Sequence, residues 1–315
     1  MKKGNENFLQ KNWVVAPLAL LCCFLWGSAF PCVKIGYALF SISPEDTASQ
    51  ILFAGVRFTL AGLLAIAIGS IISRKFLFPA KDSWGMVARL SLFQTILQYL
   101  LFYIGLANTS GVKSSIIESS SVFFTILMSS LVFHYESLGK WKLLGCVLGF
   151  AGVVLINLNG TGLDSSMSFF GEGFILLSAL SYALSSVLIK KYSQWENPVV
   201  LSGYQFVLGG LVMCLAGIAL GGQLHGFTVR STLLLLYMAM ISAVAYSIWG
   251  ILMKHNPVGR IAVFGFTNPM FGVTLSAVLL HEQNQAFTMK GLLSLILVCI
   301  GIYLVNKNFS SEKAE

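Results

Sequence analysis

Apolar stretches alternate with short polar breaks along almost the whole chain. A helix of about 20 apolar residues spans the hydrocarbon core of a bilayer, and in lipid each span must satisfy its own backbone hydrogen bonds. The pattern therefore predicts an all-α integral membrane protein with ten transmembrane helices. We place these helices at 13–37, 50–72, 84–106, 112–133, 140–157, 171–191, 199–220, 231–252, 260–280 and 290–306.

The composition supports a lipid environment for these helices. Of the 315 residues, 56% are hydrophobic and 10% are charged, whereas an ordinary soluble protein has about 25% charged residues. So few charges cannot cover a water-facing surface, and the high hydrophobicity excludes a disordered chain.

The distribution of Lys and Arg predicts how the helices are oriented. Cytoplasmic loops carry an excess of these residues. With the N-terminus in the cytoplasm, most of them fall on cytoplasmic segments, and four fall on the other side or near it: Lys34, Lys113, Arg230 and Lys290. The bias predicts a multi-pass protein with both tails, 1–12 and 308–315, in the cytoplasm. The same bias accounts for the net charge of +8, so we expect no nucleic-acid partner.

The first half of the chain, 13–158, resembles the second half, 171–307. Each half contains five predicted helices, and because five is odd, the second half enters the membrane in the opposite sense. Inverted repeats of this kind usually enclose a central site with alternating access. Chance similarity between apolar segments is the alternative. The aligned positions are Leu21 to Trp26 with Leu177 to Tyr182, Arg57-Phe58 with Gln205-Phe206, Glu136 with Glu282, and Gly145 with Gly291.

Several short motifs recur in the order found in a known family. The chain resembles the EamA type of the drug/metabolite transporter superfamily over nearly its whole length. The resemblance implies a ten-helix bundle with a central substrate cavity in a bacterial-type plasma membrane, and it favours export. One departure is Phe123, which stands where the second repeat has Pro269 and predicts a fourth helix without the corresponding kink. The motifs are Leu25 to Phe30, Arg57-Phe58, Asn268 to Phe271 followed by Glu282, and the glycines Gly145, Gly149 and Gly152.

Two charged residues lie deep within predicted helices. Glu118 and Arg57 are each about two turns from a helix start, and charges at that depth are rare and usually functional. Glu118 could bind an amine or a quaternary ammonium group, exchange a proton, or simply neutralise an Arg. Arg57 could pair with Glu118 or hold a substrate carboxylate. If both face the cavity, an amino-acid-like zwitterion would satisfy them.

Other polar and aromatic residues are candidates for the lining of a cavity. Gln94, Gln98, Tyr99 and Tyr103 form a polar stripe on the third helix. Four aromatic rings, Trp26, Tyr182, Tyr246 and Trp249, could stack on a cation or an organic substrate. Asn268 precedes a helix-breaking proline, where freed backbone groups could line a cavity. For each of these residues, ordinary packing between helices is the alternative.

We therefore expect a secondary transporter, or permease, that moves a small organic metabolite by alternating access. An amino acid or another amine-bearing compound is the favoured substrate, with or without proton coupling. A channel and an intramembrane enzyme are the alternatives. Motifs for ATP binding, metalloproteases and serine hydrolases are absent from the sequence, so we expect no enzyme, cofactor or metal. The expected partners are the substrate, membrane lipid and a second copy, joined through Gly145-x-x-x-Gly149.

Overall fold

The computed structural model describes residues 8–135, 138–157, 168–256, 261, 263–282 and 288–307, and within them every regular element is helical. Six of the predicted spans are continuous helices. They are α2 (Asn12–Leu39), α3 (Thr47–Ser73), α8 (Lys140–Asn157), α10 (Pro198–Ala219), α11 (Val229–His255) and α15 (Met289–Lys307).

The other four predicted spans are built from consecutive helical pieces. The third contains η1 (Lys81–Ser83), α4 (Trp84–Leu90), η2 (Ser91–Leu97) and α5 (Gln98–Ala107), and the fourth contains α6 (Gly111–Glu118), α7 (Ser120–Leu127) and η3 (Met128–Val132). The sixth contains η4 (Phe169–Gly173) and α9 (Phe174–Tyr192), and the ninth contains η5 (Val263–Phe266) and α13 (Thr267–Leu279). The prediction of ten helical spans is confirmed, and among the described residues seven spans are long and apolar enough to cross a membrane.

Polar residues in the short breaks set where several helices begin. The side chain of Asp46 accepts a hydrogen bond from the Ser49 N–H, and Ser110 accepts one from the Lys113 N–H. Asn197 caps α10 directly before Pro198, which fits the first turn of a helix because its missing N–H is not needed there. Polar residues in the breaks thus fix where α3, α6 and α10 begin, by accepting hydrogen bonds from N–H groups of the first turn.

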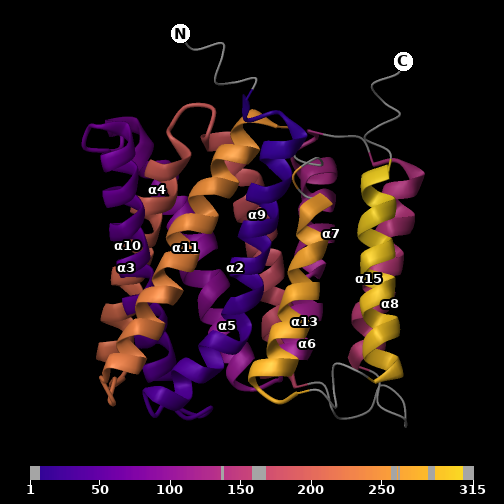
Figure 1. Ribbon diagram of the computed structural model, residues 1–315. Helices are drawn as coiled ribbons and strands as arrows, with labels where there is room; N and C mark the ends of the chain where they lie inside the picture. Colours follow the sequence, from indigo (N-terminus) through magenta and orange to yellow (C-terminus); the bar gives the residue numbers. More distant parts are fainter. Residues whose placement is uncertain are drawn as a thin grey trace.

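The helices form one bundle that runs from one face to the other (Figure 1). Helices α3 and α10 pack together at one edge, and α8 and α15 pack together at the opposite edge. Helix α2 begins and α15 ends on the same face, which we call the N-terminal side. Because the number of spans is even, the first helix begins and the last helix ends on the same face.

Glycines show how the two repeats meet at α3 and α10. A Cβ on Gly55 would lie 2.9 Å from the Gly210 carbonyl oxygen, and one on Gly62 would lie 2.5 Å from that of Gly203. The alignment that pairs Arg57 with Gln205 also pairs Gly55 with Gly203 and Gly62 with Gly210. Each glycine therefore contacts the counterpart of the other. This exchange is the signature of two inverted repeats packed across a pseudo-two-fold axis.

The glycine run of α8 also packs within the chain. A Cβ on Gly149 would collide with the ring of Phe123, and one on Gly301 of α15 would lie 2.5 Å from the Gly145 carbonyl oxygen. The face that the sequence offered for a homodimer is therefore occupied by α7 and α15 of the same chain. A homodimer stays a prediction, but Gly149 and Gly145 are already used inside the bundle.

Candidate functional site

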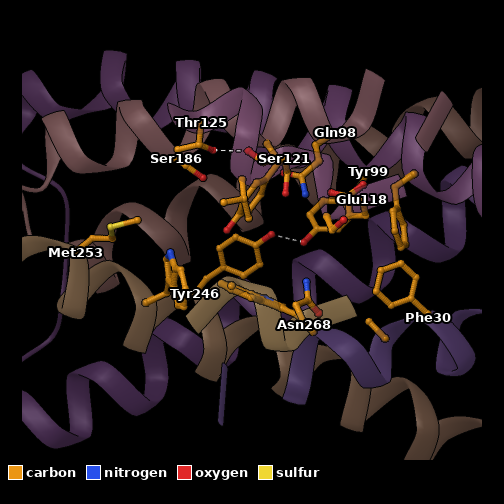
Figure 2. A pocket seen from close by; sticks show the side chains of 18 of the residues that line it. Phe30, Gln98, Tyr99, Glu118, Ser121, Thr125, Ser186, Tyr246, Met253 and Asn268 are labelled. Atoms are coloured by element: carbon orange, nitrogen blue, oxygen red, sulfur yellow. Dashed lines mark hydrogen bonds between the residues drawn. The ribbon is translucent and has the colours of Figure 1, made fainter. Parts of the chain in front are cut away.

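A cavity lies in the middle of the bundle, between the two repeats (Figure 2). Nine of the eleven candidate residues line it, and they come from seven helices or helical pieces. The nine are Trp26, Arg57, Gln98, Tyr99, Glu118, Tyr182, Tyr246, Trp249 and Asn268.

The cavity is not centred along the bundle. At one end it reaches Ser186 and Met253, near the ends of α9 and α11 on the N-terminal side. At the other end it stops at Phe30 (Figure 2). Beyond Phe30 the bundle is filled by buried aromatic side chains, and the Tyr37 hydroxyl donates a hydrogen bond of 2.9 Å to the Tyr103 carbonyl oxygen. The cavity therefore extends towards the N-terminal side and is closed towards the other.

Residues related by the repeat contact each other in the lining of the cavity. The rings of Trp26 and Tyr182, which the sequence alignment pairs, lie 6.3 Å from each other. The hydroxyl groups of Tyr99 and Tyr246 form a hydrogen bond of 2.5 Å (Figure 2). Tyr99 and Tyr246 are also counterparts in the two repeats. Their separation along the chain lies between the separation of Arg57 from Gln205 and the separation of the two aligned glutamates. The cavity is thus built on the pseudo-two-fold axis.

Glu118 stands at an interruption of the fourth span. Helix α6 ends at Glu118 and α7 begins at Ser120, while the Ser119 N–H bonds to the Ile116 carbonyl oxygen in a tighter turn. Irregular backbone within a membrane is tolerated where it borders a cavity. The carboxyl group is buried, and its Oε2 has no hydrogen-bond partner among the described residues.

The ninth span is interrupted at the equivalent position. The short η5 precedes α13, and Gly265 of η5 lines the cavity. The alignment that pairs Glu136 with Glu282 also pairs Ser119 with Gly265. Pro269 stands in the first turn of α13, where proline is accommodated. The expectation that Phe123 removes the break from the fourth helix was wrong, because the break falls one turn earlier, at Ser119.

Arg57 lies at the edge of the cavity, and each of its three nitrogens donates a hydrogen bond to a neighbouring residue. Its Nε donates to the Met238 carbonyl oxygen at 3.1 Å, Nη1 to the Tyr103 hydroxyl at 2.6 Å, and Nη2 to the Ser242 hydroxyl at 3.1 Å. The guanidinium carbon also lies 4.9 Å from the centre of the Phe58 ring. Within the described residues Arg57 forms no ion pair with Glu118, and the one salt bridge joins Lys113 to Glu172. The two buried charges are therefore separate features of the site.

Two candidates do not line the cavity. Gln94 is buried on η2, and Tyr103 lies behind the lining, where its hydroxyl accepts a hydrogen bond from Arg57 and its ring packs against Tyr99. The helical register explains the first case. Gln94 and Gln98 share a face in a regular α-helix, whereas η2 is wound with five-residue spacing, which shifts one side chain relative to the other.

Sequence reasoning missed several lining residues that helical spacing could have found. Phe102, Ser186 and Met253 each follow a candidate on the same helix by four residues, and Thr125 follows Glu118 by seven. Such spacings place side chains on one face of a helix. Chemistry alone did not single them out, because Phe, Ser, Thr and Met are common in apolar helices. Among the described residues no group of three His, Cys, Asp or Glu side chains is placed to hold a metal.

Comparison with known proteins gives the same organisation. Residues 13–158 and 169–307 each match the EamA-like transporter family. The chain is 28% identical to an uncharacterized transporter, YvbV, of Bacillus subtilis, over 94% of this chain and 93% of that protein. It is also 28% identical to a probable amino-acid metabolite efflux pump of Salmonella typhimurium, over 91% of this chain and 93% of that protein.

A solved structure shares the fold. One crystal structure superposes with a TM-score of 0.68 and covers 97% of this chain and 100% of the other, at 16% sequence identity. At that identity the likeness concerns the arrangement of the helices alone.

Proposed function

Because the chain belongs to the EamA-like transporter family and is therefore a membrane transporter, we propose that it exports a small organic metabolite through the central cavity. The favoured substrate is an amino acid or another amine-bearing compound. The cavity takes up this substrate from one side at a time, by alternating access. The protein lies in the bacterial plasma membrane, and its N-terminal side faces the cytoplasm.

One observation carries the substrate class. Glu118 lines a cavity that is also lined by aromatic rings, and one of its carboxyl oxygens is buried without a partner among the described residues. A carboxyl group inside a membrane is costly and usually faces a pathway. An ammonium group is the ligand that satisfies both features, because it donates to the carboxylate and is attracted to the faces of aromatic rings.

Three further observations support a carrier that exports. The cavity lies on the axis between inverted repeats and is closed on one side, as alternating access requires. The Salmonella relative is named as a probable amino-acid metabolite efflux pump, which favours amino acids and outward movement. Lys and Arg are concentrated on the N-terminal side, so the cavity extends towards the cytoplasm, from which an exported substrate enters.

Glu118 is also the candidate for proton coupling. A carboxyl group that gives up its proton when an amine binds, and regains it when the amine leaves, couples the two movements in opposite directions. Without such exchange the protein is a facilitator driven by the substrate gradient alone.

The test is transport by the full chain in liposomes. Vesicles loaded with unlabelled amino acid are diluted into labelled amino acid, and a carrier accumulates the label transiently by exchange, whereas a channel only equilibrates it. We expect accumulation for at least one amino acid or amine, and none in vesicles without protein. Equilibration without a transient excess would favour a channel and contradict the proposal.

Proton coupling is tested in the same vesicles, with and without a pH gradient. Glu118→Gln keeps the size of the side chain and removes its charge and its titration. If Glu118 couples transport to protons, the variant loses the response to the gradient. Transport and pH dependence that are both unchanged in Glu118→Gln would remove this residue from the mechanism.

A further inference from the structure

Building on the proposed function, we infer that the cavity selects its substrate by a protonated amine and does not require a carboxylate. The ammonium group binds at Glu118, Gln98 and Asn268. The other end of the substrate meets neutral indole N–H donors rather than Arg57. Amino-acid amides are then substrates as good as amino acids, whereas acids without an amine are not substrates.

Three residues that line the cavity each have a buried acceptor atom without a partner among the described residues. The atoms are Oε2 of Glu118, Oε1 of Gln98 and Oδ1 of Asn268. The three residues belong to three different spans and lie around the same space (Figure 2). A protonated primary amine has three N–H donors and no acceptor. Buried polar atoms are normally hydrogen-bonded, so a ligand with this donor set completes the cavity.

The aromatic rings surround the same space and add attraction for a cation. The ring of Trp26 lies 5.2 Å from that of Tyr246, 4.9 Å from that of Trp249 and 6.3 Å from that of Tyr182. These rings come from three different helices, and each of them lines the cavity. An ammonium group near their faces gains cation–π attraction in addition to its hydrogen bonds.

The donors left for the rest of the substrate are neutral. The indole N–H groups of Trp26 and Trp249 are buried and have no partner among the described residues. Each can donate to a carbonyl oxygen whether or not that oxygen carries a charge. Arg57, the cationic side chain of the lining, donates from all three of its nitrogens to Tyr103, Ser242 and Met238. These bonds use three of its five N–H groups, and turning the guanidinium towards a substrate carboxylate would break them and leave buried groups unpaired.

The inference is tested with the full chain in detergent, by calorimetric titration at a pH of about 6, where α-amino groups carry a proton. The probes are L-phenylalanine, its amide and 3-phenylpropionate, and in parallel L-alanine, its amide and propionate. We expect each amide to bind within about threefold of its amino acid, and each acid without an amine to bind at least about tenfold more weakly.

The outcomes separate the two proposals. Binding of an amino acid without binding of its amide would overturn this inference and leave the proposed function standing. So would equal binding of the acid that lacks an amine. If no amino acid or amide of either series binds, the substrate class under the proposed function is wrong and the inference falls with it.

Two carboxylate-to-amide variants locate the recognition. Glu118→Gln is expected to weaken amino acid and amide alike, by at least about tenfold, because a charged acceptor is replaced by a neutral one. Glu172→Gln is the matched control, since Glu172 is paired with Lys113 outside the cavity, and its affinities should match those of the unchanged protein. Unchanged affinity in Glu118→Gln, with a melting temperature close to that of the unchanged protein, would overturn the inference.

Discussion

Arg57 and Gln205 occupy equivalent positions in the two repeats and make equivalent contacts with different chemistry. Arg57 on α3 donates to Ser242 on α11. Gln205 on α10 accepts a hydrogen bond of 2.5 Å from the Thr95 hydroxyl on η2. The offset that relates Tyr99 to Tyr246 also relates Thr95 to Ser242. Each repeat therefore bonds its second span to the third span of the other repeat.

A second pair of contacts repeats the pattern one turn away. Arg57 donates to the Met238 carbonyl oxygen, and the Gln205 carbonyl oxygen accepts a hydrogen bond from the Ser91 hydroxyl. Ser91 and Met238 are related by the same offset. Both repeats therefore hydrogen-bond their second span to the third span of the other repeat, whereas only the first repeat uses a charged residue to do so. The comparison shows that Arg57 serves the architecture of the bundle before it serves any ligand.

The repeats differ most where the cavity is closed. Arg57 also bonds the hydroxyl of Tyr103, whose ring packs against Tyr37 in the closed half. The same offset relates Tyr103 to Gly250, where a Cβ would lie 2.9 Å from the Pro198 side chain. The closed half is therefore filled by an aromatic ring at a position where the other repeat has a glycine packed against Pro198.

The glycine crossing should be the most sensitive part of this shared architecture. In Gly62→Leu the new side chain meets the Gly203 carbonyl oxygen and Val207 at distances that no side chain tolerates. We expect little folded protein, because overpacking costs about 1–3 kcal/mol even where side chains can move, and here backbone blocks the space. Gly85→Leu is the control, since a Cβ there meets nothing within 4 Å. Size-exclusion profiles in detergent measure the outcome, and equal monodisperse yields for both variants would contradict it.

The two polar crossings should differ in their contribution to stability. Arg57→Gln copies the residue of the other repeat and removes hydrogen bonds that involve a charge, each contributing about 1.5–3 kcal/mol in proteins generally. Gln205→Leu removes the bond to Thr95, and hydrogen bonds between membrane helices contribute about 0.6 kcal/mol on average. Thermal unfolding in detergent should therefore show a clearly larger loss for Arg57→Gln. A larger loss for Gln205→Leu would reverse the comparison.

The Tyr99–Tyr246 bond lies on the axis that relates the repeats, so its two partners should behave alike. Tyr99→Phe and Tyr246→Phe each remove the same hydrogen bond, with an expected loss of about 0.6 kcal/mol, and the double variant should lose no more than either one. A double-mutant cycle of unfolding free energies measures this. Strictly additive losses would show that the two hydroxyl groups do not depend on each other.

The smallest effect is expected at a contact that only the first repeat makes. Lys113 and Glu172 form a salt bridge of 3.3 Å, in which the Lys113 side chain is 24% exposed and the Glu172 side chain is 4% exposed. Position 259, the counterpart of Lys113, is Gly in the second repeat. The buried Glu172 carboxylate also accepts hydrogen bonds from the Thr109 hydroxyl and the Ser168 N–H, so it keeps partners without Lys113. An ion pair whose cation is partly open to solvent contributes about 0–1 kcal/mol and is screened by salt. Lys113→Gln should shift the melting temperature slightly at low salt and not at high salt, and a shift that salt does not reduce would contradict this.

Much of the fold could be predicted because each span is fixed by local sequence. The limits of the ten helices follow from apolar length and from polar capping residues such as Asp46 and Asn197. Glu136, which the sequence aligned with Glu282, lies outside the described residues. Glu282 itself accepts hydrogen bonds from the Gly111 and Val112 N–H groups at the start of α6. That role depends on two spans meeting, so the sequence pattern alone did not contain it.

The candidate residues could be predicted, but their roles could not. Glu118 and Arg57 were conspicuous because charges are rare in these spans, and a pairing between them was a reasonable alternative. The pairing depends on distances between α3 and α6, which sequence spacing does not determine. In the described structure Arg57 instead donates hydrogen bonds to Tyr103 and to two residues of α11.

By itself, the sequence determined ten membrane spans, two inverted repeats and the few charged side chains that lipid makes costly. Each of these follows from hydrophobicity, parity or charge counted along the chain. Only the tertiary structure decided that Arg57 is held by its neighbours, that one Glu118 oxygen lacks a partner among the described residues, and that the cavity is closed beyond Phe30. Those outcomes depend on which side chains from different spans come within hydrogen-bonding distance of each other, and the packing of the helices determines those distances.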